Sequence, residues 1–332
     1  MELPVEILEV IYNYLDTNTD RLNFRKMCRT TIRFTQTISN PQILRTIQKY
    51  NKCIFTNLIA RFPQDIRHKH DHVTKLTCNY LQLTKLPNMP QLIELECRDN
   101  YLTQLPYMPW LTKLDCKGNR FTQLPDMPQL TKLDCTYNQL TQLPDMPQLT
   151  HLNCSFNQLT QLPDMPLVEL LCGRNQLTRL QDMPQLVTLN CTSNQIIQLP
   201  DMPLLISLEC SGNRLTQLPD TPHLTKLYCS DNQLTQLPNM PHLTKLYCSD
   251  NRLTQLPDMQ LLTELGCCDN QITQIPYMPL LTILYCSHNR LTLLPDMPLL
   301  IVLVVNNNQL IRLPNTPRLK TLRCAHYLIY HD

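Results

Sequence analysis

The stretch Leu130-Thr-Lys-Leu-Asp-Cys135-Thr-Tyr-Asn-Gln-Leu140-Thr-Gln-Leu-Pro-Asp145-Met-Pro-Gln148 is one copy of a unit that recurs along most of the chain. Copies follow one another every 19 residues, and once after 18, and the last copy is partial. A fixed period of this length is the signature of a solenoid, in which each repeat forms one coil stacked on the previous coil. The sequence therefore predicts 13 full coils and one partial coil over residues 73–325.

Apolar and polar residues alternate over the first six positions of each copy. In the copy above, Leu133 and Cys135 would point inward and Lys132 and Asp134 outward, as in a short β-strand. The two prolines of the Leu-Pro-x-Met-Pro segment exclude a regular helix there and favour an extended, polyproline-like return path. We expect an α/β solenoid: an arc with a parallel concave sheet and an extended convex side, preceded by a small α-helical domain.

An asparagine follows the strand in nearly every copy. Its side-chain amide offers donors and an acceptor to backbone groups that a turning chain would otherwise leave unpaired. Leu81 and Tyr327 take this position in the first and last copies, where only one neighbouring coil exists. We interpret these residues as a structural ladder that joins coil to coil. The early members are Asn100, Asn119, Asn138 and Asn157, and the later ones lie at 175, 194, 213, 232, 251, 270, 289 and 308.

Thirteen of the 16 cysteines fall at one position of the repeat, including Cys116, Cys135 and Cys154. Val305 occupies that position in one copy, so the position accepts a small buried apolar residue, and free cysteine behaves as one. The cysteines lack the C-x-x-C pairs of zinc sites. We therefore expect a core ladder of thiols in a reducing compartment, with no metal and no cofactor.

Composition excludes several function classes. The formal net charge is +2 and charged residues make up 17%, so no strong field indicates nucleic acid or membrane as a partner. No run of 18 apolar residues occurs, and the first residues lack the pattern of a signal peptide. We expect an intracellular, cytoplasmic protein that binds neither nucleic acid nor membranes, in a host cytoplasm if it is viral.

Residues 73–325 resemble the leucine-rich-repeat family through their L-x-x-L-x-C-x-x-N-x-L pattern. The Leu-Pro-x-Met-Pro ending is similar to the bacterial effector subclass that ends in L-P-x-L-P, although each repeat here is one residue shorter. The motif Leu-Asp-Cys…Asn-Gln-Leu-Thr-Gln-Leu-Pro is more similar still to the repeats in proteins of giant DNA viruses such as mimivirus. The resemblance implies a protein-binding scaffold. Bacterial effectors of this kind continue into a catalytic ligase domain, whereas only eight residues follow Cys324, so we expect no such domain.

Residues 1–47 have helical rather than strand spacing of apolar residues. Their sequence resembles an F-box in three successive segments. These are the opening L-P-x-E-I-L-x-x-I-x-x-x-L-D, the stretch Asp20-Arg-Leu-Asn-Phe-Arg-Lys-Met-Cys-Arg29, and Asn40-Pro41. Thr30 and Thr31 stand where the family usually has a tryptophan. The resemblance implies docking onto a Skp-type adaptor and thus recruitment of a cullin–RING ubiquitin ligase. The adaptor-binding residues would be Leu3, Pro4, Ile7, Ile11 and Leu15.

A purely structural role for this segment is the alternative. A solenoid exposes the apolar end of its first coil, and a terminal cap must cover it. Residues 48–72 would form a linker and cap under either reading, and residues 326–332 a short tail. The whole chain would then be an interaction or structural repeat protein, of viral or effector origin.

The residue types at the outward strand positions change along the array, and this change indicates a binding site. Early coils present mixed charges, with Lys75, Glu94, Glu96, Lys113, Asp115, Lys132 and Asp134. Later coils stack aromatic residues, and tyrosines flanked by charge are typical of protein recognition. Cross-strand tyrosine pairs that only stabilise the sheet are the alternative. The predicted target-binding residues on the concave face are Lys226, Tyr228, Lys245, Tyr247, Glu264, Tyr285 and His288.

A catalytic function has little support in the sequence. His68, His70 and His72 alternate and could bind a metal from one face of a strand, but a polar linker before the array explains them as well. No glycine-rich phosphate loop or H-E-x-x-H motif occurs. Cys268 faces outward but has no basic neighbour in sequence to lower its pKa. We expect a protein that binds rather than an enzyme.

Overall fold

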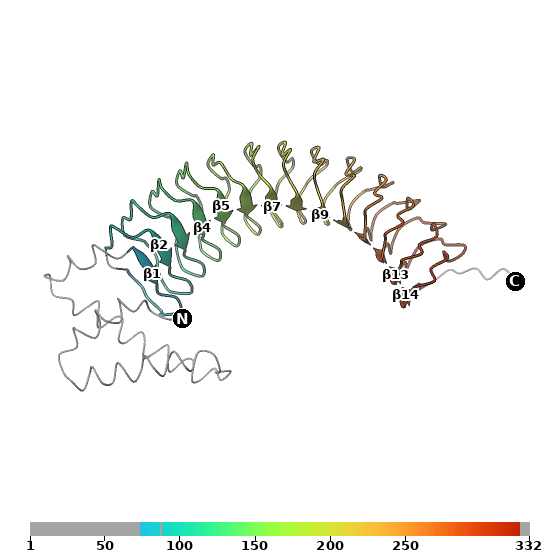
Figure 1. Cartoon of the computed structure of the whole chain (residues 1–332), viewed down its shortest axis with the longest axis horizontal. Helices are drawn as coiled ribbons and strands as arrows, with labels where there is room; N and C mark the ends of the chain where they lie inside the picture. The colour runs from blue at the N-terminus through green and yellow to red at the C-terminus, as the bar shows by residue number, and fades with distance from the viewer. Residues whose placement is uncertain (1–73, 87, 326–332) are drawn as a thin grey trace, which may run out of the picture.

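The computed structural model describes residues 74–86 and 88–325, which contain one sheet of 14 parallel strands. The strands lie in sequence order, so each coil places its strand beside that of the previous coil. Figure 1 shows the coils stacked into an arc with the strands on its concave side. The strands are β1 (Lys75–Thr77), β2 (Glu94–Glu96), β3 (Lys113–Asp115), β4 (Lys132–Asp134), β5 (His151–Asn153), β6 (Glu169–Leu171), β7 (Thr188–Asn190), β8 (Ser207–Glu209), β9 (Lys226–Tyr228), β10 (Lys245–Tyr247), β11 (Glu264–Gly266), β12 (Ile283–Tyr285), β13 (Val302–Val304) and β14 (Thr321–Arg323).

This arrangement confirms the predicted parallel-sheet solenoid. The expected helical domain at 1–47, the linker and cap at 48–72 and the tail at 326–332 lie outside the described residues. So do His68, His70 and His72, and Tyr327 at the last ladder position.

Each strand has three residues, and its central leucine is buried in β1 to β13. The two flanking side chains face the concave surface, as the alternation predicted. Neighbouring strands pair residue for residue, so the three positions form three rows across the sheet. At the last strand, Leu322 is 44% exposed because no further coil among the described residues covers it.

The core is a continuous stack of leucine, cysteine and methionine side chains, one set from each coil. The described cysteines are free thiols, and 12 of the 14 are buried. Burial raises the pKa of these thiols, that of Cys78 to about 12, so they remain protonated and apolar. Cys324 is only partly buried, for the same reason as Leu322. The prediction of a cysteine ladder inside the solenoid is thus confirmed.

The convex side contains no helix or strand in the described residues. Each Met-Pro-x-Leu segment instead closes a tight turn in which the leucine amide donates to the methionine carbonyl, as Leu130 does to Met127 at 3.0 Å. The coil that starts at Leu149 is one residue shorter, and there Leu167 donates to Met165 at 2.8 Å. The missing residue is therefore absorbed on the convex side, and the pairing of β5 with β6 is unchanged.

The asparagine ladder has the predicted role. The Asn138 amide nitrogen donates to the carbonyls of Cys116 and Cys135 at 3.1 and 3.0 Å, and its oxygen accepts from the amide of Phe121 at 3.0 Å. The same set of bonds recurs from Asn100 to Asn308. Leu81, in the first copy, has no such side chain but donates its backbone amide to Asn100. Each asparagine thus fastens its own coil to the coil before it.

Candidate binding surface on the concave face

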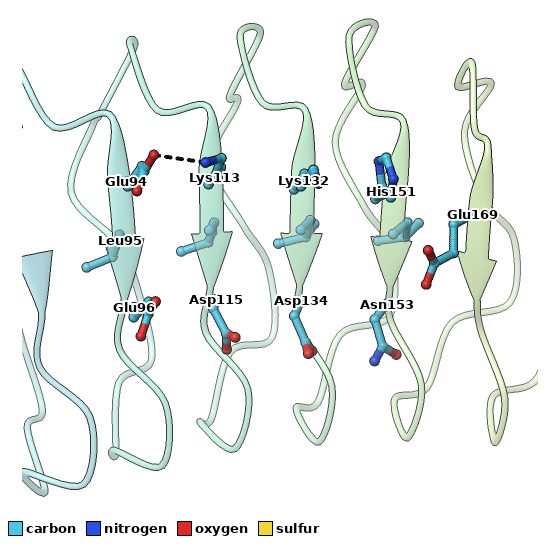
Figure 2. A pocket seen from close by; sticks show the side chains of 13 residues that line it. Glu94, Leu95, Glu96, Lys113, Asp115, Lys132, Asp134, His151, Asn153 and Glu169 are labelled. Atoms are coloured by element: carbon cyan, nitrogen blue, oxygen red, sulfur yellow. Dashed lines mark hydrogen bonds and ion pairs between the residues drawn. The ribbon is translucent and has the colours of Figure 1, made fainter. Parts of the chain in front are cut away.

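The concave face carries two outward rows, formed by the first and the last residue of each strand. Figure 2 shows them across β2 to β6: Glu94, Lys113, Lys132, His151 and Glu169 in one row, and Glu96, Asp115, Asp134 and Asn153 in the other. Together with the central leucines they line a shallow hollow of about 260 Å³. The first row mixes lysines with the carboxylates Glu94 and Glu169, and the second row carries carboxylates and Asn153.

Glu94 is the centre of an ion-pair group in the first row. Its carboxylate lies 3.1 Å from Nζ of Lys75 and 3.0 Å from Nζ of Lys113. Hydrogen bonds from Lys113 and Lys75 lower the pKa of Glu94 below its ordinary value. The charges of Lys75, Glu94 and Lys113 therefore satisfy one another across the strands.

The second row is less balanced. Asp115 pairs with Arg98, whose Nη2 lies 2.6 Å from its Oδ2. Asp134 is the neighbour of Asp115 across the strands and accepts from the amide of Thr136 at 3.0 Å. Burial, and then the charge of Asp134, raise the pKa of Asp115 in spite of Arg98.

The predicted tyrosines and the charged residues beside them lie together on β9 to β12. We call this surface the tyrosine patch, and it consists of Lys226, Tyr228, Lys245, Tyr247, Glu264 and Tyr285. Tyr228 and Tyr247 pair across the strands, and their rings stack with centroids 5.2 Å apart and planes 4° from parallel. Gly266 pairs with both Tyr247 and Tyr285, so the aromatic row is interrupted at one strand.

Gly266 and Glu264 hold Tyr247 in place. A Cβ atom on Gly266 would lie 2.7 Å from the ring of Tyr247, so the ring occupies space that only glycine leaves open. The Tyr247 hydroxyl donates to Glu264 at 3.1 Å, and Lys245 forms a 2.7 Å ion pair with the same carboxylate. Burial and the hydrogen bond to Glu264 raise the pKa of Tyr247 to about 12, so the phenol remains a neutral donor.

His288 belongs to a different part of the surface. It lies in the turn after β12, with its ring 3.9 Å from Asp269 and within hydrogen-bond distance of Asn307. Six of the seven predicted target-binding residues therefore share the concave sheet, and His288 lies in the row of turns beside it. The proposed adaptor-binding residues, Leu3, Pro4, Ile7, Ile11 and Leu15, lie outside the described residues.

Sequence reasoning missed a second aromatic cluster. Tyr137 and Phe156, in the turns after β4 and β5, stack with ring centroids 4.1 Å apart and are both exposed. Most other copies have Asp, Gly, Ser or Asn at this position of the repeat. Two aromatic residues in consecutive copies at a position of turn-forming residues were the available signal.

Neither a metal centre nor a membrane span emerges from residues 74–86 and 88–325. No three His, Cys, Asp or Glu side chains among them are grouped to hold a metal ion. No helix in this part is long and apolar enough to cross a bilayer. Cys268 is half-buried, and burial raises the pKa of its thiol.

The comparisons with known proteins agree with this architecture. The family described as "Leucine Rich repeats (2 copies)" matches residues 128–166 and 222–261. Among solved structures, YopM from Yersinia enterocolitica WA-314 is 32% identical with a TM-score of 0.68, and the match covers 79% of this chain and 66% of that one. The functional domain of InlJ from Listeria monocytogenes, described as including a cysteine ladder, is 31% identical with a TM-score of 0.67, covering 76% and 67%.

A third structure, YopM described as a leucine-rich effector protein from Yersinia pestis, is 26% identical with a TM-score of 0.61, covering 84% of this chain and 99% of that one. About a third of the first two relatives lies outside the match. A search of curated protein sequences finds no match. The 19-residue period, the asparagine and cysteine ladders and these likenesses lead to one conclusion: the chain belongs to the leucine-rich-repeat family.

Proposed function

We propose that the protein is a non-catalytic scaffold that binds a protein partner on its concave face, with the tyrosine patch as the main anchor. The observation that carries this proposal is the fixed arrangement of Tyr228 and Tyr247. Their rings stack, Gly266 leaves space for the ring of Tyr247, and Glu264 accepts a hydrogen bond from the Tyr247 hydroxyl. Tyrosine is enriched among the few residues that contribute most binding energy at interfaces, and a side chain already ordered loses little entropy on binding.

The charges of the patch support recognition of a partner with its own polar rim. Lys226 is exposed and stands beside Lys245, whose charge is neutralised by Glu264. The patch therefore presents apolar rings next to one unpaired cation. Such a centre of aromatic surface with charges at its margin is typical of protein interfaces.

A stabilising role limited to the sheet is the alternative. Cross-strand pairs contribute about 0.2–1 kcal/mol each, so Tyr228 and Tyr247 would add little to the stability of a core this long. A role in binding and a role in stability make different predictions for the same variants.

The test uses the full chain as bait in quantitative affinity capture, followed by cross-linking of the captured protein. The variant Tyr228→Ser, Tyr247→Ser, Tyr285→Ser should reduce capture of the main partner by roughly tenfold or more. A matched control, Tyr107→Asn with Tyr277→Asn, removes two exposed tyrosines at the x position of Leu-Pro-x-Met-Pro, where other copies have Asn. Equal capture by the folded triple variant and the wild type would reject the tyrosine patch as the anchor.

A second, finer proposal concerns the N-terminal segment. The F-box-like letters of residues 1–47 support a substrate adaptor that would hold its target near a cullin–RING ligase, in the cytoplasm of a cell or of a virus's host. Its chemistry would be proximity, because the ligase would be supplied by other proteins. Leu3→Asp with Ile7→Asp should abolish binding to a Skp-type adaptor, while the triple tyrosine variant keeps it. If the wild type binds no such adaptor, residues 1–72 act as a cap and the protein is a purely structural or interaction scaffold.

A further inference from the structure

The turns that follow the strands place one residue per coil in the left-handed region of backbone conformation. Most coils use residue types that tolerate it, such as Asp99, Asp231, Asp250, Gly212 and Asn307, with φ between 52° and 67°. In this conformation Cβ crowds the following carbonyl, and aromatic side chains cannot offset that cost by the local hydrogen bonds that Asp and Asn form.

Two consecutive coils nevertheless place aromatic residues there. Tyr137 and Phe156 have φ of 54° and 57°, and their side chains are 49% and 37% exposed. Equivalent residues of neighbouring coils lie about 4.8 Å apart, so the two rings stack with centroids 4.1 Å apart. Tyr80 also has a positive φ, of 61°, and an exposed ring, but the next coil has Asp99 at this position, so the ring has no aromatic neighbour among the described residues of the row. Backbone strain together with a stack of two exposed rings points to function more than to folding.

Cations close both ends of this stack. Nζ of Lys117 lies 5.8 Å from the ring centre of Tyr137, and the Arg174 guanidinium lies 5.1 Å from that of Phe156. Neither cation forms an ion pair with any residue of the described part of the chain. We call these four residues the rim stack: Lys117, Tyr137, Phe156 and Arg174.

The geometry selects the chemistry of what can bind. One face of each ring stacks on the other ring, and a cation lies over each ring, at 5.8 Å from the centre of Tyr137 and 5.1 Å from that of Phe156. A nucleic-acid base would have to displace one of these neighbours to stack between them. The ring edges remain exposed, and aromatic edges carry partial positive charge. Edges and cations together favour carboxylates and apolar side chains.

We propose that the rim stack is a docking site for an acidic segment of a protein partner, in which apolar residues lie between two carboxylates. The apolar residues would contact the edges of Tyr137 and Phe156, and the carboxylates would pair with Lys117 and Arg174. These two cations come from coils three spacings apart, about 14 Å, and acidic residues four apart in an extended peptide span about 13 Å. The site is separate from the tyrosine patch, which lies on β9 to β12.

The experiment measures binding of a fluorescein-labelled peptide, Glu-Glu-Leu-Val-Leu-Glu-Glu, to the full chain by fluorescence anisotropy. A peptide with lysine in place of each glutamate and an oligothymidylate of 12 nucleotides are the comparison probes. The wild type should bind the acidic peptide at least tenfold more tightly than either comparison probe, and added salt should weaken the binding.

Two variants separate the rings from the charges. Tyr137→Asn with Phe156→Asn replaces both rings by a residue type already used at this position, Asn307, and should reduce binding at least tenfold while the midpoint of thermal unfolding is unchanged or raised. Lys117→Gln with Arg174→Gln keeps the rings and should also reduce binding at least tenfold. If the ring variant unfolds more easily than the wild type, this charge variant is the one that tests the docking site. Tyr277→Asn, a remote exposed tyrosine, should bind like the wild type.

Several results would overturn the proposal. These are equal binding of the acidic and basic peptides, no binding of either, tighter binding of oligothymidylate, or unchanged affinity in the charge variant. A Tyr247→Ala variant should bind the acidic peptide normally. If that variant alone loses binding, the peptide occupies the tyrosine patch, and the rim stack is rejected while the proposed function stands.

Discussion

A Cβ atom on Gly266 would lie 2.7 Å from Cδ1 of Tyr247 and 3.1 Å from its Cε1. The absence of a side chain on one strand therefore fixes the position of an aromatic ring on the next. The same ring stacks on Tyr228 and donates to Glu264. A single glycine in the concave row thus determines how the tyrosine patch is presented to a partner.

Gly266→Ala should displace the ring of Tyr247 and break its hydrogen bond to Glu264. The expected loss in the free energy of unfolding is about 1–3 kcal/mol, as for other overpacked sites, measured by denaturant titration. In a Tyr247→Ala background the same substitution should cost almost nothing, because the clash is gone. Equal costs in the two backgrounds would show that the ring does not depend on residue 266.

Asp134→Asn should stabilise the protein at neutral pH. The folded state raises the pKa of Asp115 through burial and the charge of Asp134, so ionisation of Asp115 costs folding free energy at neutral pH. That cost disappears as the pH falls through the raised pKa towards about 3.9, the value of an unfolded aspartate. The advantage of Asp134→Asn should therefore be largest at neutral pH and shrink as the pH falls through the raised pKa of Asp115.

The matched control is Asp145→Asn, which removes an exposed carboxylate on the convex side and changes the net charge equally. Its free energy of unfolding should follow that of the wild type across the pH range. A stabilisation by Asp134→Asn that does not vary with pH would contradict the electrostatic explanation.

Asn138→Ala should be among the most destabilising single substitutions in the array. It leaves the buried amide of Phe121 without its acceptor and removes the hydrogen bonds from Asn138 to the carbonyls of Cys116 and Cys135. The expected cost is about 2–4 kcal/mol in the free energy of unfolding. The adjacent Gln139→Ala, on the exposed side of the same turn, should change it by less than about 0.5 kcal/mol. Similar effects of the two substitutions in urea titrations would refute the ladder's role.

Cysteine substitutions should distinguish packing from polarity in the core. Cys135→Val introduces the residue found at 305 and should cost less than about 1.5 kcal/mol. Cys135→Ser keeps the size of the side chain but buries a hydroxyl. It should lower the free energy of unfolding by about 1–3 kcal/mol more than Cys135→Val does. Thermal unfolding of both variants under reducing conditions measures the difference, and a serine variant as stable as the valine variant would contradict an apolar slot.

The repeat pattern was sufficient to predict the coil, the strand and the ladder. Leu133, Cys135 and Asn138 recur at fixed positions, and each position has one environment, so the period alone indicates which side chains are inside. Tyr228 and Tyr247 were placed on the concave face by the same alternation. That Gly266 makes room for Tyr247 was not predictable, because the direction in which a ring leans depends on neighbouring coils.

The turn positions were harder to predict from sequence. His288 was assigned to the binding face, but it follows the strand and lies in the row of left-handed residues. Tyr137 and Phe156 occupy that row too, and nothing in the residues of a single copy indicates a positive φ or a stack between copies. Contacts between equivalent residues of successive coils become visible only once the coils are superposed in space.

Each ladder asparagine bonds only within its own coil and to the coil before it, and the bonds are the same from one junction to the next. Recombination between copies could therefore insert or delete one whole repeat and leave every donor and acceptor at the new junction satisfied. Gene duplication can thus change the length of the arc in single steps, and a lineage can adjust how much of a partner the protein spans without redesigning the residues that contact it.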